Sequence, residues 1–569
     1  MTRYLLILTL TVLALAAGIG AQTPTPLPEN VPAPEIAPNY KSDKRGLPDL
    51  GRVGVDVTQQ KTLTLNDAIT LALENNRDIE VTRKTATIAD FDLRIARGFY
   101  QPRLAGQTYY DRSTTPNVSI FSSNQKNTIG SFVGNLALTG SLPSNGTQFS
   151  GTFNNQRATT NNPITILSPQ LNSSLGFSVT QPLFRGRKFD QARRTIEIAK
   201  RNIELTDTQF RQRSIETVAT VQKAYWDLTY ALRNLQVQRD AVRDAKSQLE
   251  HNRRLVSEGQ LAPIDIVASE TQVANFEQAV YDALNAVNLS ENILKNLISP
   301  NRTREIWNAA LMPVEPVEIA VPDPTLTDAI DLAIDNRPEL EINDTQKKIN
   351  KIDQRLYRDQ KKPQIDLVAG YSSSGIGGSL SPNFSSPFFV ACAPDDTACI
   401  IRQQQQQAQL QTLLSSIGSS ASSVGDIFAN KYPVFRVGIN FNLPLFGDKT
   451  AAAQYGKSLV EGERLGVQRE QIEQGIQVEV RNALQAIRTG EARLRSAAVA
   501  RENTAKQYES EQRKLDAGQS DIYKVLERQT ALTTARSNEF RARTELNKAI
   551  AELQRATGNT LKANNIDAK

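Results

Sequence analysis

The chain has 569 residues, of which 39% are hydrophobic, and its mean hydropathy of -0.40 excludes a bundle of membrane-spanning helices. The 66 basic residues are nearly balanced by 60 acidic residues, and the net charge is +6. Because both signs are interleaved along helical segments, we interpret them as solvated, ion-paired helix faces rather than as a nucleic-acid-binding patch.

The first 60 residues carry an export signal followed by an extended arm. Arg3 precedes an apolar stretch at 5–17 and small residues at 18–21, which predicts a signal peptide over 1–21. No cysteine follows the cleavage site to carry a lipid, and no later apolar run approaches the roughly 20 residues of a membrane helix. Repeated prolines between positions 24 and 48 predict extended chain, so we assign 22–60 to an N-terminal arm.

The rest of the chain repeats one pattern. The segment that starts at Asp67 recurs at Asp328, an offset of 328 − 67 = 261 residues. Further pairs near this offset are Pro102 and Pro363, Tyr110 and Tyr371, and Gly259 and Gly518. We therefore predict two repeats, 61–298 and 323–558, joined by a linker at 299–322 and followed by a polar tail at 559–569.

Each repeat is expected to begin with a helix and to continue with strands. Thr64 and Thr325 are the expected N-caps, and the helical pattern continues to about Pro102 or Pro363. Alternating strands follow, and a returning strand closes each repeat. One apolar and one polar face over about 10 residues is what a transmembrane barrel strand requires. The same alternation also suits a surface sheet in a soluble protein.

Two long segments, about 188–258 and 449–517, contain almost no proline or glycine and predict long helices. Apolar residues recur every seven positions, which is typical of coiled-coil packing. The first row is Val221, Leu228, Leu235, Val242, Leu249 and Val256, and the second includes Val480, Ile487, Leu494, Tyr508 and Leu515. About 70 residues give a rod of roughly 105 Å. Shorter helices at about 64–101, 263–298, 325–361 and 520–557 would stack in pairs beside these rods, with hairpin turns at Gly259 and Gly518.

The number of strands predicts association between copies. Four strands per chain would leave two unpaired edges, because single-chain barrels begin at eight strands. An additional alternating hairpin at about 131–157 lies between the strands of the first repeat. It is either an external loop, which we expect, or a pair of strands that raises the number to six.

Catalytic and metal-binding patterns are not found in the sequence, and we predict neither an enzyme nor a bound cofactor. His251 is the one histidine and is expected to face solvent. Without clusters of histidine and cysteine, no zinc or copper site is predicted. Cys392 and Cys399 lie close together in an exported chain, so we expect a disulfide between them.

This arrangement resembles the TolC-like outer membrane efflux protein family over about residues 60–560. The matching segments are 63–69, 181–184, 224–228 and the turn at 258–260 followed by Asp265. The resemblance implies an α+β outer-membrane protein. In this expectation, a homotrimer shares one transmembrane β-barrel, with four strands from each chain embedded in outer-membrane lipid. A periplasmic α-helical coiled-coil barrel of roughly 100 Å would continue the β-barrel and dock onto a periplasmic adaptor protein and an inner-membrane pump.

The resemblance also implies two sites at the hairpin turns. The expected adaptor contacts are Glu258, Gly259, Gln260, Ala517, Gly518 and Gln519. The expected charged constriction consists of Asp265, Lys524 and Glu527. Lys524 occupies a position that is usually acidic in the family, and it could pair with Asp265 or Glu527 as a latch. A third possibility is that all three are solvated charges.

We therefore expect a passive exit duct of a tripartite efflux or type I secretion system, located in the outer membrane with a large periplasmic part. The alternative is a structural coiled-coil protein of the envelope without a pore, but paired amphipathic strands favour the duct. A periplasmic adaptor would be expected to contain one helical hairpin instead of two.

Overall fold

The computed structural model describes residues 51–117, 124–314, 320–385, 392–393, 395–419, 421–444 and 447–566. The expected signal peptide and most of the proline-rich arm lie outside the described residues. Residues 54–569 form one compact unit, and the following description concerns that unit.

Each of the two expected repeats begins with two helices in place of the one expected. They are α2 (Leu65–Asn75) and α3 (Arg77–Arg97), and α6 (Leu326–Asn336) and α7 (Pro338–Gln360). Thr64 caps α2, since its Oγ1 accepts a hydrogen bond from the Asp67 amide at 3.1 Å. The prediction of single helices at 64–101 and 325–361 is wrong. Asn76 interrupts the first by capping α3 through its side chain, and Pro338 interrupts the second, because proline disfavours a helical residue before it.

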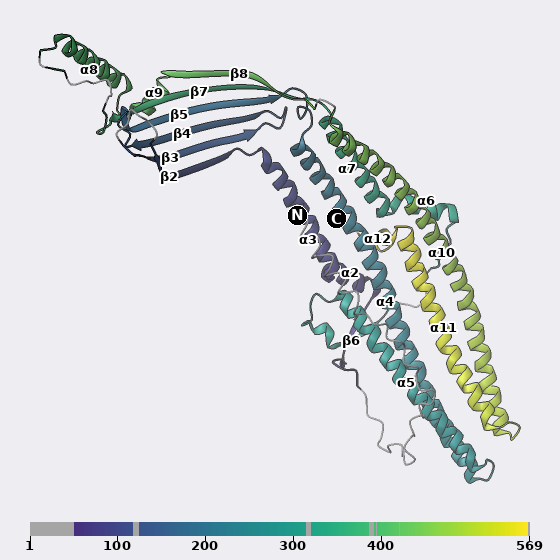
Figure 1. The fold of residues 1–569 in the computed structure, drawn as a ribbon. Helices are drawn as coiled ribbons and strands as arrows, with labels where there is room; N and C mark the ends of the chain where they lie inside the picture. The colour runs from purple at the N-terminus through teal and green to yellow at the C-terminus, as the bar shows by residue number, and fades with distance from the viewer. Residues whose placement is uncertain are drawn as a thin grey trace, which may run out of the picture. The chain divides into compact units, whose positions relative to one another are not determined.

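The long helices form the wall of the helical part (Figure 1). They are α4 (Gln191–Ser257), α5 (Pro263–Ile298), α10 (Lys449–Asp516) and α11 (Ile522–Ala556). Near the sheet, the neighbouring helices of the wall follow the order α3, α4, α7 and α10. Near the hairpin turns, the order of neighbouring helices is α5, α4, α11 and α10. The heptad rows lie in the contacts, because Val221, Leu228, Val480 and Ile487 are all buried.

One six-stranded antiparallel sheet follows the helices, with the order β2-β3-β4-β5-β7-β8 (Figure 1). Its strands are β2 (Arg103–Pro116), β3 (Lys126–Ser141), β4 (Gln148–Thr160), β5 (Leu167–Pro182), β7 (Gln364–Leu380) and β8 (Tyr432–Asn442). The sheet of one chain therefore has six strands, where four per chain were expected. The additional hairpin, expected as an external loop, pairs with β2 and β5 along its length.

The two faces of the sheet differ in chemistry. The registers put alternate residues of all six strands on one largely apolar face. Exposed members of this face are Leu104, Tyr110, Phe132, Leu136, Leu138, Phe177, Val179, Phe435, Val437, Ile439 and Phe441. The opposite face is mainly Ser, Thr, Asn and Gln; for example, Ser150 and Ser178 lie 2.8 Å apart, Oγ to Oγ.

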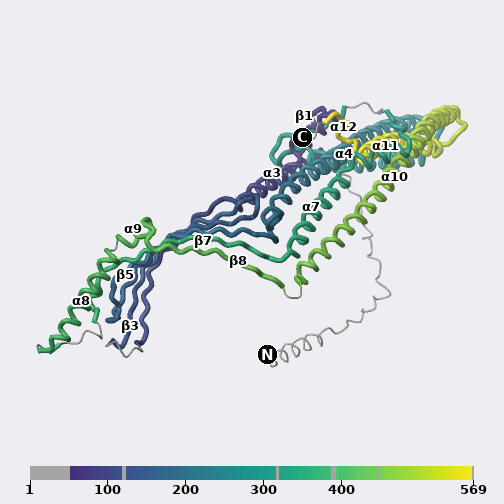
Figure 2. Tube along the Cα trace, turned by 90° about the horizontal axis from the view of Figure 1, so that it is seen from above, coloured from purple at the N-terminus to yellow at the C-terminus, as the bar shows by residue number. Residues whose placement is uncertain are grey.

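Two helices lie between β7 and β8, at the end of the sheet away from the long helices. Helix α9 (Ser422–Phe428) packs on the apolar face, where the Ser373 Oγ donates to the Ile427 carbonyl at 3.1 Å. Helix α8 (Thr397–Ile417) has no buried residue and extends beyond the strands (Figure 2).

The segment that follows α5 is anchored by a buried ion pair. It contains the 3-10 helix η2 (Glu305–Trp307) and β6 (Ala309–Pro313), which pairs in parallel with β1 (Asp56–Leu63). Glu291 and Lys295 of α5 are fully buried. Glu291 accepts from the Leu311 amide at 2.7 Å, and the Lys295 ammonium donates to the Trp307 carbonyl at 2.9 Å.

The C-terminal segment contributes to the core, although a polar tail was expected there. It contains the short helix α12 (Thr560–Ala563), and Leu561 is buried in the same apolar cluster as Trp226.

Candidate functional site

Both helical hairpins end in the same backbone turn. In the first, the amide of Gly259 donates to the Val256 carbonyl and the amide of Gln260 donates to the Leu255 carbonyl. The second has the equivalent bonds from Gly518 to Leu515 and from Gln519 to Lys514. This is the Schellman motif, in which glycine adopts a left-handed conformation. The φ angles are 76° at Gly259 and 68° at Gly518.

The six residues expected to contact an adaptor are all exposed. Glu258, Gly259 and Gln260 form the first turn, and Ala517, Gly518 and Gln519 form the second. These turns lie at the opposite ends of α4 and α10 from the strands. The six residues are therefore accessible to a partner in the single chain.

The two hairpin turns lie beside each other, and residues next to them are in contact. Leu261 packs against a cluster that contains Leu515, Ile522 and Val525. His251, which was expected to face solvent, is partly buried, and its Nε2 lies 3.0 Å from the Asp516 Oδ1. This contact connects α4 to α10. Its sequence signal is weak because the two residues are 265 positions apart.

The acidic cap occupies different positions in the two hairpins. In the first, Asp265 accepts a hydrogen bond from the Ala262 amide at 3.1 Å. In the second, Asp521 takes the N-cap position, and its Oδ1 accepts from the Lys524 amide at 3.0 Å. Lys524 therefore occupies the position that Asp265 has in the first hairpin. In the second hairpin, the capping carboxylate of Asp521 lies three residues closer to the turn. Sequence reasoning missed Asp521, although an aspartate just before a helix is a recognisable N-cap signal.

Lys524 forms an ion pair within its own helix. Its Nζ lies 3.0 Å from the Asp521 Oδ2. The hydrogen bond to Asp521 raises the pKa of Lys524, and the same bond lowers the pKa of Asp521. The suggested latch partners, Asp265 and Glu527, are not the partner that Lys524 has in the single chain.

Glu527 lies at one end of a groove between α10 and α11. The groove has a volume of about 1200 Å³. Its other end contains Glu545, and the residues between them on α11 are mostly small, including Ala531, Thr534 and Ala535. Glu527 is exposed and lies one helical turn from Lys524.

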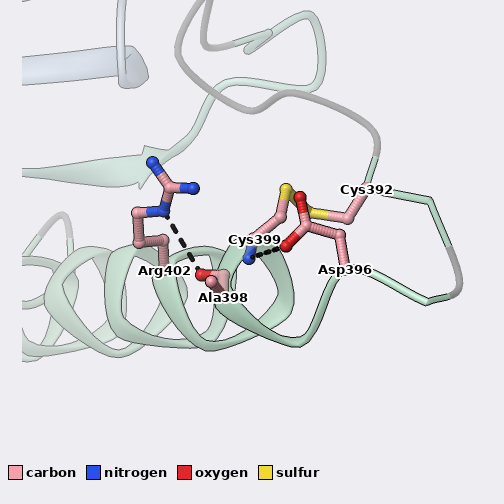
Figure 3. The surroundings of a disulfide bond; sticks show 5 residues. All are labelled: Cys392, Asp396, Ala398, Cys399 and Arg402. Carbon is pink, nitrogen blue, oxygen red and sulfur yellow. Dashed lines mark hydrogen bonds between the residues drawn. A yellow bond between two sulfur atoms is a disulfide. The ribbon is translucent and has the colours of Figure 1, made fainter.

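A disulfide joins Cys392 and Cys399 in the loop that leads into α8 (Figure 3). The two Cα atoms are 5.7 Å apart. Asp396 lies between the two cysteines and caps the helix, because its Oδ1 accepts from the Cys399 amide at 3.0 Å. The disulfide therefore belongs to the loop and makes no contact with the hairpin turns.

No cluster of three or more His, Cys, Asp or Glu side chains in the described part of the chain is arranged to hold a metal ion. None of the helices in the same residues combines the length and hydropathy of a membrane-spanning helix.

Three solved structures with a similar fold are outer-membrane proteins. The Campylobacter jejuni CmeC outer membrane channel is 15% identical, with a TM-score of 0.59, and the match covers 88% of this chain and 90% of CmeC. The open state of the Neisseria gonorrhoeae MtrE outer membrane channel is 16% identical, with a TM-score of 0.57 and coverage of 87% and 89%. The Vibrio cholerae outer membrane protein VceC is 12% identical, with a TM-score of 0.56 and coverage of 87% and 96%. At these identities the comparison establishes the fold.

The family is established by a match to sequence. A comparison with curated proteins found no similar sequence. The model of the outer membrane efflux protein family matches residues 68–299 and 401–559, which together exceed half of the chain. The chain therefore belongs to the outer membrane efflux protein family, the outer-membrane channels that work with adaptor proteins and inner-membrane pumps in tripartite efflux systems.

Proposed function

We propose that three copies of this chain close into a homotrimer that forms a passive duct through the outer membrane and the periplasm. The proposal rests on the two edges of the sheet, because in one copy both edge strands lack a neighbour on their outer side. In the sheet, β2 and β8 each have a single neighbouring strand, and their residues are almost all exposed. Open strand edges do not occur in lipid, because their backbone groups would lack hydrogen-bond partners.

The strand directions suit such a closure. Strand β2 runs away from the helices and β8 returns toward them, so β8 of one copy would meet β2 of the next in antiparallel orientation. Antiparallel neighbours are the arrangement of membrane barrels. The number of copies, three, follows from the resemblance to the family.

The helical part has matching lateral edges. On α3, Val81, Ile88 and Ile95 recur every seven residues and are 65%, 58% and 73% exposed. On α10, Val460 and Val467 are likewise seven apart and exposed. Two apolar heptad rows at opposite sides of one wall can pack against each other between neighbouring copies. This supports a closed ring of helices rather than a structural stalk. The like order of helices and strands and the turns at Gly259 and Gly518 support two repeats within each chain.

The amphipathic sheet supports a duct through lipid. Its apolar face would contact the acyl chains, and its Ser-, Thr- and Asn-rich face would line a watery lumen. The duct would use no energy of its own, and its partner pump would supply the driving force. We infer that the exposed turns at 258–260 and 517–519 contact the adaptor.

We also infer that the hairpin turns hold the constriction of the duct. Three copies would repeat Asp265, Lys524 and Glu527 around one axis. Because Asp521 neutralises Lys524, Glu527 would supply a ring of negative charge that favours cations.

The closed ring of helices can be tested by introducing a charge into the apolar heptad row of α3. The Ile88→Asp variant should shift the purified protein from trimer to monomer in mild detergent. An unpaired carboxylate buried between copies costs about 3 kcal/mol or more at each interface. Size-exclusion chromatography with light scattering measures the mass.

Thr87→Asp is the matched control, because it adds the same charge to the neighbouring exposed position, a quarter turn around the helix. This variant should remain trimeric. An Ile88→Asp protein that stays trimeric, or a wild-type protein that forms pores as a monomer, would contradict the proposal.

A further inference from the structure

The two strands of the β3–β4 hairpin are about as long as the strands on either side of it. Strand β3 has 16 residues and β4 has 13, compared with 14 in β2 and 16 in β5. A tilted transmembrane strand needs about 9–11 residues. The ladder from β2 to β5 contains no bulge or break in register. The hairpin is therefore long enough to cross the membrane beside its neighbours.

The apolar face continues across this hairpin without interruption. The register places Leu136 of β3 opposite Phe153 of β4, and Phe153 opposite Leu175 of β5. On the other face, Asn154 donates to the Ser174 Oγ at 3.3 Å. A hairpin above the membrane would have no need for an apolar face aligned with that of its neighbours.

The turn of the hairpin lies at the helical end of the sheet, where an external loop cannot reach. The Arg193 Nε of α4 donates to the Pro143 carbonyl at 2.9 Å, and the Gln181 side chain donates to the Asn145 carbonyl at 3.1 Å. Gly146 has a φ of 68°, and a Cβ there would lie 2.7 Å from the Gly186 carbonyl oxygen. These contacts hold the turn against the start of α4.

The circumference of the helical wall accommodates six strands per chain. Three copies with four helices each make twelve helices, which at about 9 Å spacing give a ring roughly 34 Å across. Eighteen strands spaced about 4.8 Å apart and tilted by about 40° give a backbone ring roughly 36 Å across. Twelve strands give roughly 24 Å by the same arithmetic. The eighteen-strand ring matches the helices that it must join.

We propose that the outer-membrane barrel of this protein contains eighteen strands, six from each copy, and admits hydrated solutes about 2 nm wide. The proposal rests on the trimeric duct of the preceding section. A side-chain layer of about 5 Å on each side leaves a lumen of roughly 26 Å, against roughly 14 Å for twelve strands. The mostly uncharged lining contributed by β3, β4 and β5 would select by size more than by charge.

The experiment measures which strands contact lipid. Tryptophan replaces Leu136, Phe153 or Leu175 in separate trimers reconstituted into vesicles of phosphatidylcholine brominated on its acyl chains, which quenches nearby indole fluorescence. L136W and F153W should be quenched to within about a third of L175W, because all three lie at one level of the apolar face. N154W, on the opposite face, should keep most of its fluorescence. The two native tryptophans serve as background: Trp226 lies about 50 Å along α4 from the sheet, and Trp307 lies beside Lys295 of α5.

The outcomes separate this proposal from the duct itself. Quenching of L175W without quenching of L136W and F153W would place the hairpin outside the lipid and overturn the eighteen-strand barrel. Unquenched fluorescence at L175W as well would mean that the sheet does not meet lipid, and the duct would fail with it. If the protein has the mass of a trimer and all three tryptophans are quenched, the result supports both the eighteen-strand barrel and the trimeric duct.

A second measurement addresses the width of the lumen. Neutral polyethylene glycols added on the side of the sheet should enter the trimer up to a hydrodynamic radius of about 10 Å or more, seen as reduced single-channel conductance. A cut-off near 7 Å, the radius of a twelve-strand lumen, would contradict the wide barrel even if the hairpin contacts lipid.

Discussion

At the scale of single residues, the hairpin turns depend on two glycines in the left-handed region. A Cβ at Gly259 would meet open space, so alanine there would cost backbone strain alone. We expect Gly259→Ala to destabilise the turn by about 1 kcal/mol, which corresponds to roughly fivefold faster hydrogen exchange of its amides. Mass spectrometry of peptic peptides that span residues 255–265 measures this exchange.

The matched control is Gly475, which lies inside α10 with open space around its Cβ position. Gly475→Ala should stabilise its helix by about 0.5–1 kcal/mol and slow local exchange. Equal effects of the two substitutions would show that the left-handed turn is not what stabilises the tip.

At the scale of secondary-structure elements, α9 depends on glycines in β7 for its contact with the sheet. A Cβ at Gly375 would lie 1.9 Å from the Ser423 carbonyl oxygen. We expect Gly375→Ala to displace α9 at a cost of about 1–3 kcal/mol. The loop between β7 and β8 contains Arg402 and Lys431 as trypsin sites, and its cleavage should become about fivefold faster or more on intact trimers.

Gly438→Ala in β8 is the control for this prediction, because its Cβ meets open space. Cleavage of that variant should match the wild type. If Gly375→Ala were cleaved no faster than Gly438→Ala, α9 would not depend on the close approach to β7.

At the scale of the whole molecule, the charges near the turns should control ion flow through the duct. We expect Glu527→Ala trimers to lose at least about half of their preference for cations, because a threefold ring of carboxylates is removed. Lys524→Ala should strengthen the preference, since Asp521 loses its partner. Asp265→Ala is expected to change conductance as well. Reversal potentials across planar bilayers measure the selectivity.

Glu545→Ala is the control for this effect. Glu545 lines the same groove as Glu527, but it lies about 27 Å further along α11 from the turn. The selectivity of this variant should be unchanged. If none of Asp265, Lys524 and Glu527 altered conductance or selectivity, the constriction would lie elsewhere, while the duct itself would remain.

Local patterns in the sequence determined most elements of this protein. The heptad spacing of Val221 and Leu228 predicted buried helix contacts, and both residues are buried. Gly259 and Gly518 predicted the hairpin turns, because the left-handed conformation needs glycine and is set by the turn itself. Alternation in the strands predicted their two faces, since the period of a strand is a local property.

The tertiary structure decided which elements became neighbours. The alternation at 131–157 predicted a hairpin, but its place in the sheet depends on Arg193, 50 residues from the turn that it holds. The buried pair of Glu291 and Lys295 depends on groups from the following segment, and the contact of His251 with Asp516 joins α4 to α10. Periodicity specifies which face of an element is apolar, whereas the partner of that face follows from contacts between residues far apart in the chain.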